Sequence, residues 1–202
     1  MKHVTQTVPL VLISALLAVP LSGCISIDAE SNTVAAPGSS EPEPPRTRGW
    51  EDFTRVDGEN VWIGGQPDTD ALRAFRAAGG TTVVNLRTER EMAMMPYYAE
   101  AVRAAGLRYV HAPTSGSAMG REHFETIADE LDGPVLLHCG SGGRATYAWA
   151  MRGIDTGELS AGDAVAWCHD FRGGRAWETG DGKLYEFAGE APPAEEAKES
   201  TP

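Results

Sequence analysis

The residues best suited to chemistry form one short segment, Cys139-Gly-Ser-Gly-Gly-Arg144, between an apolar strand pattern and a helical pattern. A helix N-terminus offers unpaired backbone N–H groups and a positive dipole, and glycines let a loop curl around one anion. The same field favours a thiolate, which is the nucleophilic form of cysteine. Arg144 can add a two-pronged contact to an oxyanion. The segment therefore predicts an anion-binding loop that carries a nucleophile.

The side chains around this cysteine have more than one interpretation. His138 can hold the loop backbone or favour the thiolate, and Ser141 can donate a hydrogen bond to the sulfur. Cys139 could instead be a buried structural thiol, but the glycines and the arginine favour chemistry. His138 and Cys139 are adjacent and lack a third cluster, so we predict no metal and no cofactor. The residues expected to supply the amides are Gly140, Ser141, Gly142 and Gly143.

Strand and helix patterns alternate from Trp50 to about Phe187. This alternation predicts an α/β fold, a single domain with a mainly parallel central sheet flanked by helices on both faces. Active loops of such folds lie at the C-terminal ends of strands, where residues 139–144 fall. No element is predicted for residues 172–183. Strands are predicted at 61–63, 82–86, 108–111 and 134–138, the last of them central, and helices at 70–78, 97–105, 121–131, 144–151 and 160–171.

The beginning of the chain has the pattern of an export signal. Residues 8–19 are almost wholly apolar, but this run is too short for the roughly 20 residues that span a bilayer. Leu21-Ser-Gly-Cys24 resembles the bacterial lipobox, in which the cysteine is acylated; an ordinary cleaved signal with a chance cysteine is the alternative. We expect lipidation of Cys24 and anchoring in the bacterial cell envelope, at the outer membrane or periplasmic face. The predicted organisation is a signal peptide at 1–23, a flexible tether at 24–49, the domain at 50–188 and a disordered acidic tail at 189–202.

The charge of the chain limits its partners. The formal net charge is −12 at pH 7. Such an acidic surface repels nucleic acid, so we expect no nucleic-acid partner, and any anion site must be a local exception.

Several motifs together resemble a known family. His138-Cys139-x-Ser-Gly-x-Arg144 is similar to the signature of the cysteine-dependent phosphatases, the superfamily of protein tyrosine and dual-specificity phosphatases. Gly65-Gln-Pro67, Val84-Asn-Leu-Arg87 and Tyr109-Val-His-Ala-Pro113 occur in the order of one bacterial branch, the phosphatase-like domain of beta-lactamase hydrolase-like proteins. The resemblance implies a phosphatase-like fold and a hydrolase that acts on a small or protein-borne phosphomonoester.

The resemblance also implies roles for single residues. Cys139 would attack phosphorus and form a thiophosphate intermediate, while Arg144 and the loop amides would stabilise the transition state. Arg87 would line the site, or would simply be a surface charge at a strand end.

Cys139 could also form a disulfide with Cys168, since an exported thiol meets an oxidising compartment.

Two departures from the wider superfamily keep other functions open. The loop is Cys-x4-Arg, because alanine stands at position 145, and this shorter spacing is common in rhodanese-type sulfurtransferases that use a cysteine persulfide. The loop at 112–121 holds no carboxylate to act as general acid, and only Glu122 and His123 follow it. The alternatives are therefore a sulfurtransferase with a Cys139 persulfide and a catalytically weak anion-binding module.

Overall fold

The structure, a computed structural model, describes residues 47–193 of the chain. The predicted signal peptide, Cys24 and most of the tether lie outside the described residues, as does most of the tail. The strands are β1 (Thr54–Arg55), β2 (Val61–Gly64), β3 (Thr82–Asn85), β4 (Arg108–His111) and β5 (Val135–His138). The helices are α1 (Thr69–Ala77), α2 (Glu89–Met92), α3 (Tyr98–Ala104), α4 (Arg121–Glu125), α5 (Gly143–Asp155), α6 (Ala161–Phe171) and α7 (Glu178–Ala188), with 3-10 turns η1 (Trp50–Asp52) and η2 (Ala128–Asp132).

The sheet confirms the predicted α/β fold. Its strand order is β1-β2-β5-β3-β4, and only β1 runs antiparallel to its neighbour. The apolar strand β5 is central, as expected for a strand buried on both faces. Gly64 of β2 and Asn85 of β3 both pair with His138. The segments that follow these three strands therefore begin at the same edge of the sheet.

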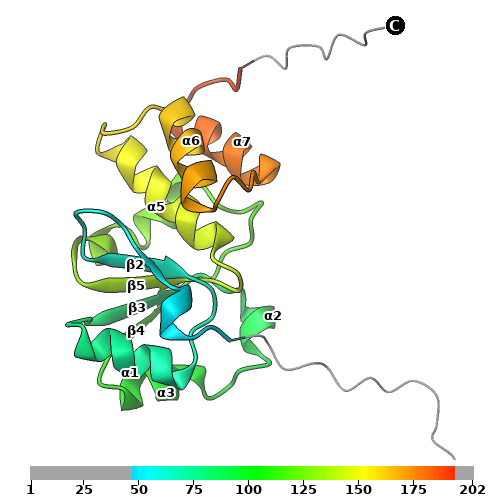
Figure 1. Cartoon of the computed structure of the whole chain (residues 1–202). Helices are drawn as coiled ribbons and strands as arrows, with labels where there is room; N and C mark the ends of the chain where they lie inside the picture. Colours follow the sequence, from blue (N-terminus) through cyan, green and yellow to red (C-terminus); the bar gives the residue numbers. More distant parts are fainter. Residues whose placement is uncertain (1–46, 194–202) are drawn as a thin grey trace, which may run out of the picture. The chain divides into compact units, whose positions relative to one another are not determined.

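Helices cover both faces of this sheet (Figure 1). Helices α1 and α3 lie on one face, and α5 lies on the other, with α6 and α7 packed against it. Successive residues of β5 point to opposite faces: Leu136 joins the core under α1 and α3, whereas Val135 and Leu137 join the core that includes α5. The central strand is thus fixed from both sides directly before the cysteine.

One predicted helix is broken. The pattern at 121–131 predicted a continuous helix, but α4 ends at Glu125 and a separate turn, η2, begins at Ala128. The hydroxyl of Thr126 donates to the carbonyl of His123 at 2.7 Å, which competes with continuation of the helix. Phe124, Ile127 and Leu131 are nevertheless all buried in the core that includes α5, and Ala128 is partly buried against it.

The first half of helix α7 lies within residues 172–183, for which the sequence predicts no element. Gly180 and Gly182 lower its intrinsic helix propensity. A Cβ on Gly180 would lie only 2.5 Å from Trp177 and 2.7 Å from Tyr147, so the glycine permits close packing. Tertiary contact therefore decides the structure where local propensity does not.

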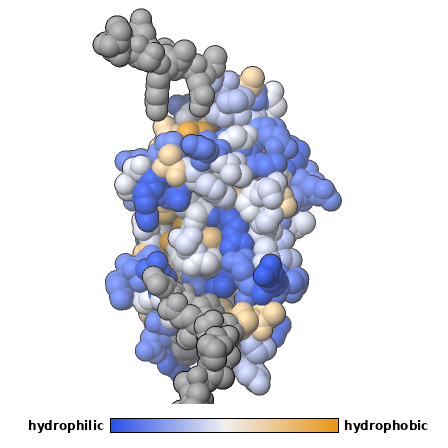
Figure 2. All heavy atoms as spheres, turned by 90° about the vertical axis from the view of Figure 1, so that its right-hand side faces the viewer, coloured by the Kyte–Doolittle hydropathy of each residue, from blue (hydrophilic) through white to orange (hydrophobic). Residues whose placement is uncertain are grey.

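None of the helices between residues 47 and 193 has the length and apolar character needed to cross a membrane. On the face that carries α2, hydrophobic residues form only small, separate spots among hydrophilic and neutral ones (Figure 2).

Candidate active site

The loop after β5 is tied to the end of β2. The amide of Cys139 donates to the carbonyl of Gly64 at 3.4 Å, and the amide of Gln66 donates to the carbonyl of Gly140 at 3.3 Å. Gly65 and Ser141 form an isolated antiparallel bridge. The central strands therefore set the position of the cysteine.

The sulfur of Cys139 lies inside this loop. The residue is only 1% exposed, and the amide of Gly142 donates to Sγ at 3.2 Å. The sequence suggested Ser141 as the donor to sulfur, but the side chain of Ser141 is exposed and the backbone of Gly142 fills that role. Gly142 adopts a left-handed conformation with φ of 93°, which glycine reaches without strain, where the loop turns into α5.

Gly142→Ala should destabilise the protein. The left-handed conformation costs an alanine about 1–2 kcal/mol, and the added Cβ would lie 3.4 Å from the backbone of Gly64. We expect urea denaturation to show a loss of that size or more in the free energy of unfolding. Gly157 also has a positive φ, but open space surrounds its missing Cβ, so Gly157→Ala is the matched control for conformational strain alone. An equal loss in both variants would mean that contact with Gly64 contributes nothing.

Arg144, in the first turn of α5, is held by other segments. Its Nη1 and Nη2 donate to the two carboxylate oxygens of Glu91 at 2.8 and 2.7 Å. Nη1 also donates to the carbonyls of Leu86 and Thr114 at 3.2 and 2.8 Å. Burial alone would lower the pKa of Arg144, but the hydrogen bonds to Glu91 and the nearby Cys139 sulfur raise it. The guanidinium is thus a fixed cation beside the sulfur.

Glu91 holds Arg144 in place, a contact that the sequence alone does not predict. It closes a capping box at the start of α2, where Thr88 and Glu91 exchange side-chain and backbone hydrogen bonds. Burial alone would raise the pKa of Glu91, but hydrogen bonds from Arg144 and the Thr88 backbone lower it to about 2. Glu91 is therefore ionised at neutral pH and cannot act as a general acid. The pattern Thr88-x-x-Glu91 indicates the cap but not its contact with Arg144.

A cavity of about 220 Å³ opens at Cys139. Glu122 and His123 do not reach it; they line a different cavity, and Nε2 of His123 lies 3.0 Å from the carbonyl of Ala112. No carboxylate is among the residues that line the cavity at Cys139, so the described part of the chain places no general acid there. Its lining consists of Gly116, Cys139, Ser141, Gly143, Arg144, Arg172 and Trp177.

Arg87 lies behind the loop and is not a surface charge. The residue is 7% exposed, and its Nη1 donates to Oε1 of Gln66 at 3.2 Å. Its Nε lies 3.8 Å from Oε1 of Glu91. Arg87 is not among the residues that line the cavity at Cys139. It supports the carboxylate that holds Arg144.

His138 holds the loop through hydrogen bonds. Its ring is fully buried, with Nδ1 3.3 Å from the carbonyl of Cys139 and Nε2 2.8 Å from the hydroxyl of Tyr98. Nδ1 must donate to the carbonyl, so Nε2 accepts from the hydroxyl. Burial, helped by the nearby Arg87 and Arg144, lowers the pKa of His138 to about 3. The neutral ring therefore positions the loop backbone rather than supplying charge to the sulfur.

Buried His138 should make stability depend on pH. The pKa of the His138 ring is 6.5 in the unfolded chain and about 3 in the folded one. As pH falls below 6.5, the ring therefore takes up a proton in the unfolded chain and stays neutral in the folded one. The free energy of unfolding should fall as pH drops below 6.5, with a slope from this group that approaches about 1.4 kcal/mol per pH unit towards pH 4.5. His138→Gln should flatten the curve by that slope, measured by urea denaturation across this range. Equal slopes in the two proteins would contradict a neutral buried ring.

Cys168 is separate from this chemistry. Both Cys139 and Cys168 are free thiols in the structure, so the disulfide considered from sequence is not formed here. Cys168 is fully buried between helices, where burial raises the pKa of its thiol. Across residues 47–193, no three His, Cys, Asp or Glu side chains cluster as a metal site would require.

Residues 52–155 match the model of a family described as the phosphatase-like domain of beta-lactamase hydrolase-like protein. The beta-lactamase hydrolase-like protein of Xylella fastidiosa (strain Temecula1) is 32% identical over 126 residues, which is 58% of this chain and 29% of that protein. The chain thus spans less than a third of the length of this curated relative.

Solved structures of cysteine-based phosphatases share the fold. Tk-PTP in its active form is 22% identical with a TM-score of 0.56, and the match covers 70% of this chain and 99% of that one. TpbA of P. aeruginosa, in a cysteine-to-serine form bound to phosphotyrosine, is 15% identical with a TM-score of 0.54 and coverage of 72% and 91%. At such identities, the likeness supports the architecture of the domain.

Proposed function

This chain belongs to the family of the phosphatase-like domain of beta-lactamase hydrolase-like proteins, and on that premise we propose that it hydrolyses phosphomonoesters. One observation carries the proposal. The Sγ of Cys139, within 3.2 Å of an inward backbone amide, and the fixed guanidinium of Arg144 meet in one small cavity. A nucleophile beside a fixed cation is the arrangement that phosphoryl transfer needs.

The proposed reaction has two steps. The thiolate of Cys139 attacks phosphorus, so that an S–P bond forms while the bond from phosphorus to the leaving oxygen breaks. Water then attacks phosphorus, the S–P bond breaks, and inorganic phosphate leaves with the thiolate restored. Arg144 and the loop amides stabilise the negative charge on the phosphoryl oxygens in both steps.

The leaving group determines which phosphomonoesters are good substrates. Glu91 is ionised and bound to Arg144, and within residues 47–193 no carboxylate lines the cavity at Cys139. A leaving oxygen must therefore depart without a proton from a side-chain acid, or take one from water. Aryl phosphates satisfy this requirement because a phenolate is a stable anion. We infer a preference for aryl phosphates over alkyl phosphates, in keeping with the phosphotyrosine bound by TpbA.

An assay of the full chain under reducing conditions tests the proposal. A general acid contributes about 10²–10⁴-fold, so its absence should make phosphate release from p-nitrophenyl phosphate exceed that from an alkyl phosphate by at least a factor of this size. A parallel assay follows thiocyanate formation from thiosulfate and cyanide. Thiocyanate without phosphate release would establish a persulfide on Cys139 and refute the phosphatase. Turnover in neither assay would leave an anion-binding module.

A further inference from the structure

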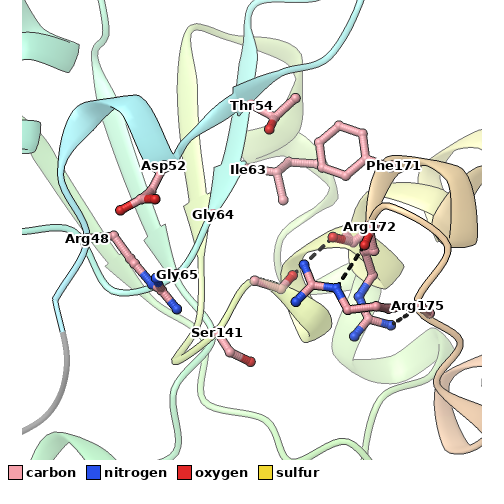
Figure 3. Close-up of a pocket in the computed structure, with 12 residues that line it drawn as sticks. Arg48, Asp52, Thr54, Ile63, Gly64, Gly65, Ser141, Phe171, Arg172 and Arg175 are labelled. Carbon is pink, nitrogen blue, oxygen red and sulfur yellow. Dashed lines mark hydrogen bonds between the residues drawn. The ribbon is translucent and has the colours of Figure 1, made fainter.

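A second cavity adjoins the one at Cys139. It has a volume of about 300 Å³, and Ser141 and Arg172 line both cavities. Figure 3 shows Arg48 on one side of this second cavity and Arg172 and Arg175 on the other, with Ser141 between them. We call it the arginine pocket, after the three guanidinium side chains among its lining residues, Arg48, Arg172 and Arg175.

Two of these arginines are fixed by each other. They follow the end of α6, where Nη1 of Arg172 donates to the carbonyl of Arg175 at 3.0 Å and Nε of Arg175 donates to the carbonyl of Arg172 at 2.8 Å. Gly173 and Gly174 between them have positive φ values, which allow the tight reversal. The turn therefore presents two cations to the pocket in a defined arrangement.

The backbone of Arg48, on the other side of the arginine pocket, is held by two hydrogen bonds. Its amide donates to the carbonyl of Gln66 at 2.6 Å, and its carbonyl accepts from the amide of Asp68 at 3.0 Å. A Cβ on Gly65 would lie 3.0 Å from Cγ of Arg48 and 3.1 Å from the carbonyl oxygen of Gly140. The stem of Arg48 therefore packs against Gly65, directly after β2, which itself lies against Gly140 of the loop that follows β5.

The charges of the arginine pocket are not neutralised. No salt bridge among residues 47–193 involves Arg48, Arg172 or Arg175. One carboxylate, Asp52, is among the lining residues. Converging cations repel each other, and in a chain with a net charge of −12 such an arrangement is a local exception. Planar guanidinium groups bind phosphate oxygens well, so the chemistry of the pocket suits a phosphate group.

We propose that the arginine pocket binds a second phosphate group of the substrate while Cys139 acts on the first, so that the preferred substrate is a small molecule that carries two phosphate groups. The inference rests on the proposed function, because it places the first phosphate group at Cys139. The two cavities adjoin, since Ser141 and Arg172 line both. All three arginines lie outside residues 52–155, the segment that matches the family. The second site is thus a property of this chain's flanking segments.

Binding to the Cys139→Ser form of the full chain tests the proposal without turnover. The probes are alkane-α,ω-bisphosphates of three to six carbons and the alkyl monophosphates of matching length, compared by calorimetry at constant ionic strength. A single charge-assisted hydrogen bond is worth about tenfold in affinity, so at least one bisphosphate should bind tighter than its monophosphate by about that factor. A further Arg48→Gln/Arg175→Gln change should abolish the preference and leave monophosphate affinity unchanged.

Arg73→Gln is the matched control, because Arg73 is an exposed arginine on α1 that pairs with Asp70 away from either cavity. It should retain the bisphosphate preference. Equal affinity for both probe classes overturns the proposal, and so does a preference that survives the double change. If the protein prefers bisphosphates but releases no phosphate, the result supports the second site and refutes the proposed hydrolysis.

Discussion

Cys139→Ser is expected to reduce phosphate release from p-nitrophenyl phosphate by on the order of 10⁴-fold or more, as loss of a catalytic nucleophile does. A serine hydroxyl is not ionised at neutral pH and needs a base to attack phosphorus. Residues 47–193 place no free base at the cavity, because Glu91 is bound to Arg144 and the ring of His138 bonds to Tyr98 and the loop backbone. Initial rates of phosphate release under reducing conditions measure the effect.

The control for this variant is the other buried thiol. Cys168 is fully buried but does not line the cavity at Cys139, so Cys168→Ser should keep activity even if it lowers stability. Unfolding by urea shows whether each variant remains folded. Activity retained in a folded Cys139→Ser protein would refute covalent chemistry at this residue, and equal losses in both variants would point to a defect in folding.

Arg144→Lys should have the second largest effect, a loss of about 10²–10³-fold in kcat, the range for removal of one preorganised transition-state contact. The guanidinium bonds to both oxygens of Glu91 and to the carbonyls of Leu86 and Thr114. Lysine keeps the charge but is a point donor on a flexible stem. It cannot satisfy these acceptors and face a phosphoryl group together. Steady-state kinetics on p-nitrophenyl phosphate measures the loss.

Arg108→Lys is the matched control for that substitution. Arg108 also bonds to a carboxylate, Glu130, but this pair is exposed and lies at the other end of β4 from the loop that meets Arg144. We expect full activity. An Arg144→Lys protein with wild-type kcat would show that the guanidinium only holds the loop together.

The part of the site that the sequence predicts is the part made by neighbours along the chain. The apolar run ending at His138, the glycines after Cys139 and the helical pattern from Arg144 each have a local signal, and the structure places them as strand, loop and helix. The fold follows from the same kind of pattern. Local signals also give the wrong donor to sulfur, because a side chain such as Ser141 is visible in a sequence and the direction of a backbone N–H is not.

The contacts between distant segments could not be predicted. Glu91 and Arg144 are 53 positions apart, and nothing in either segment points to the other. The burial of Arg87 depends on Gln66 and on the edge where three strands end together. Trp177 lines the cavity from a segment whose glycines argue against a helix. Such positions follow from packing, which a single sequence does not display.

Helices α6 and α7, which pack against α5, determine how much of the chain a truncated protein must keep. The family match stops at Asp155, yet Tyr147 in the middle of α5 is fully buried, with its ring 5.0 Å from that of Trp177 and its hydroxyl bonded to Asp181. Exposing one such aromatic residue forfeits roughly 1.5–3 kcal/mol, out of the roughly 5–15 kcal/mol that keeps a domain folded. A fragment cut at the family boundary would therefore be a damaged protein, and the smallest useful one extends through Ala188.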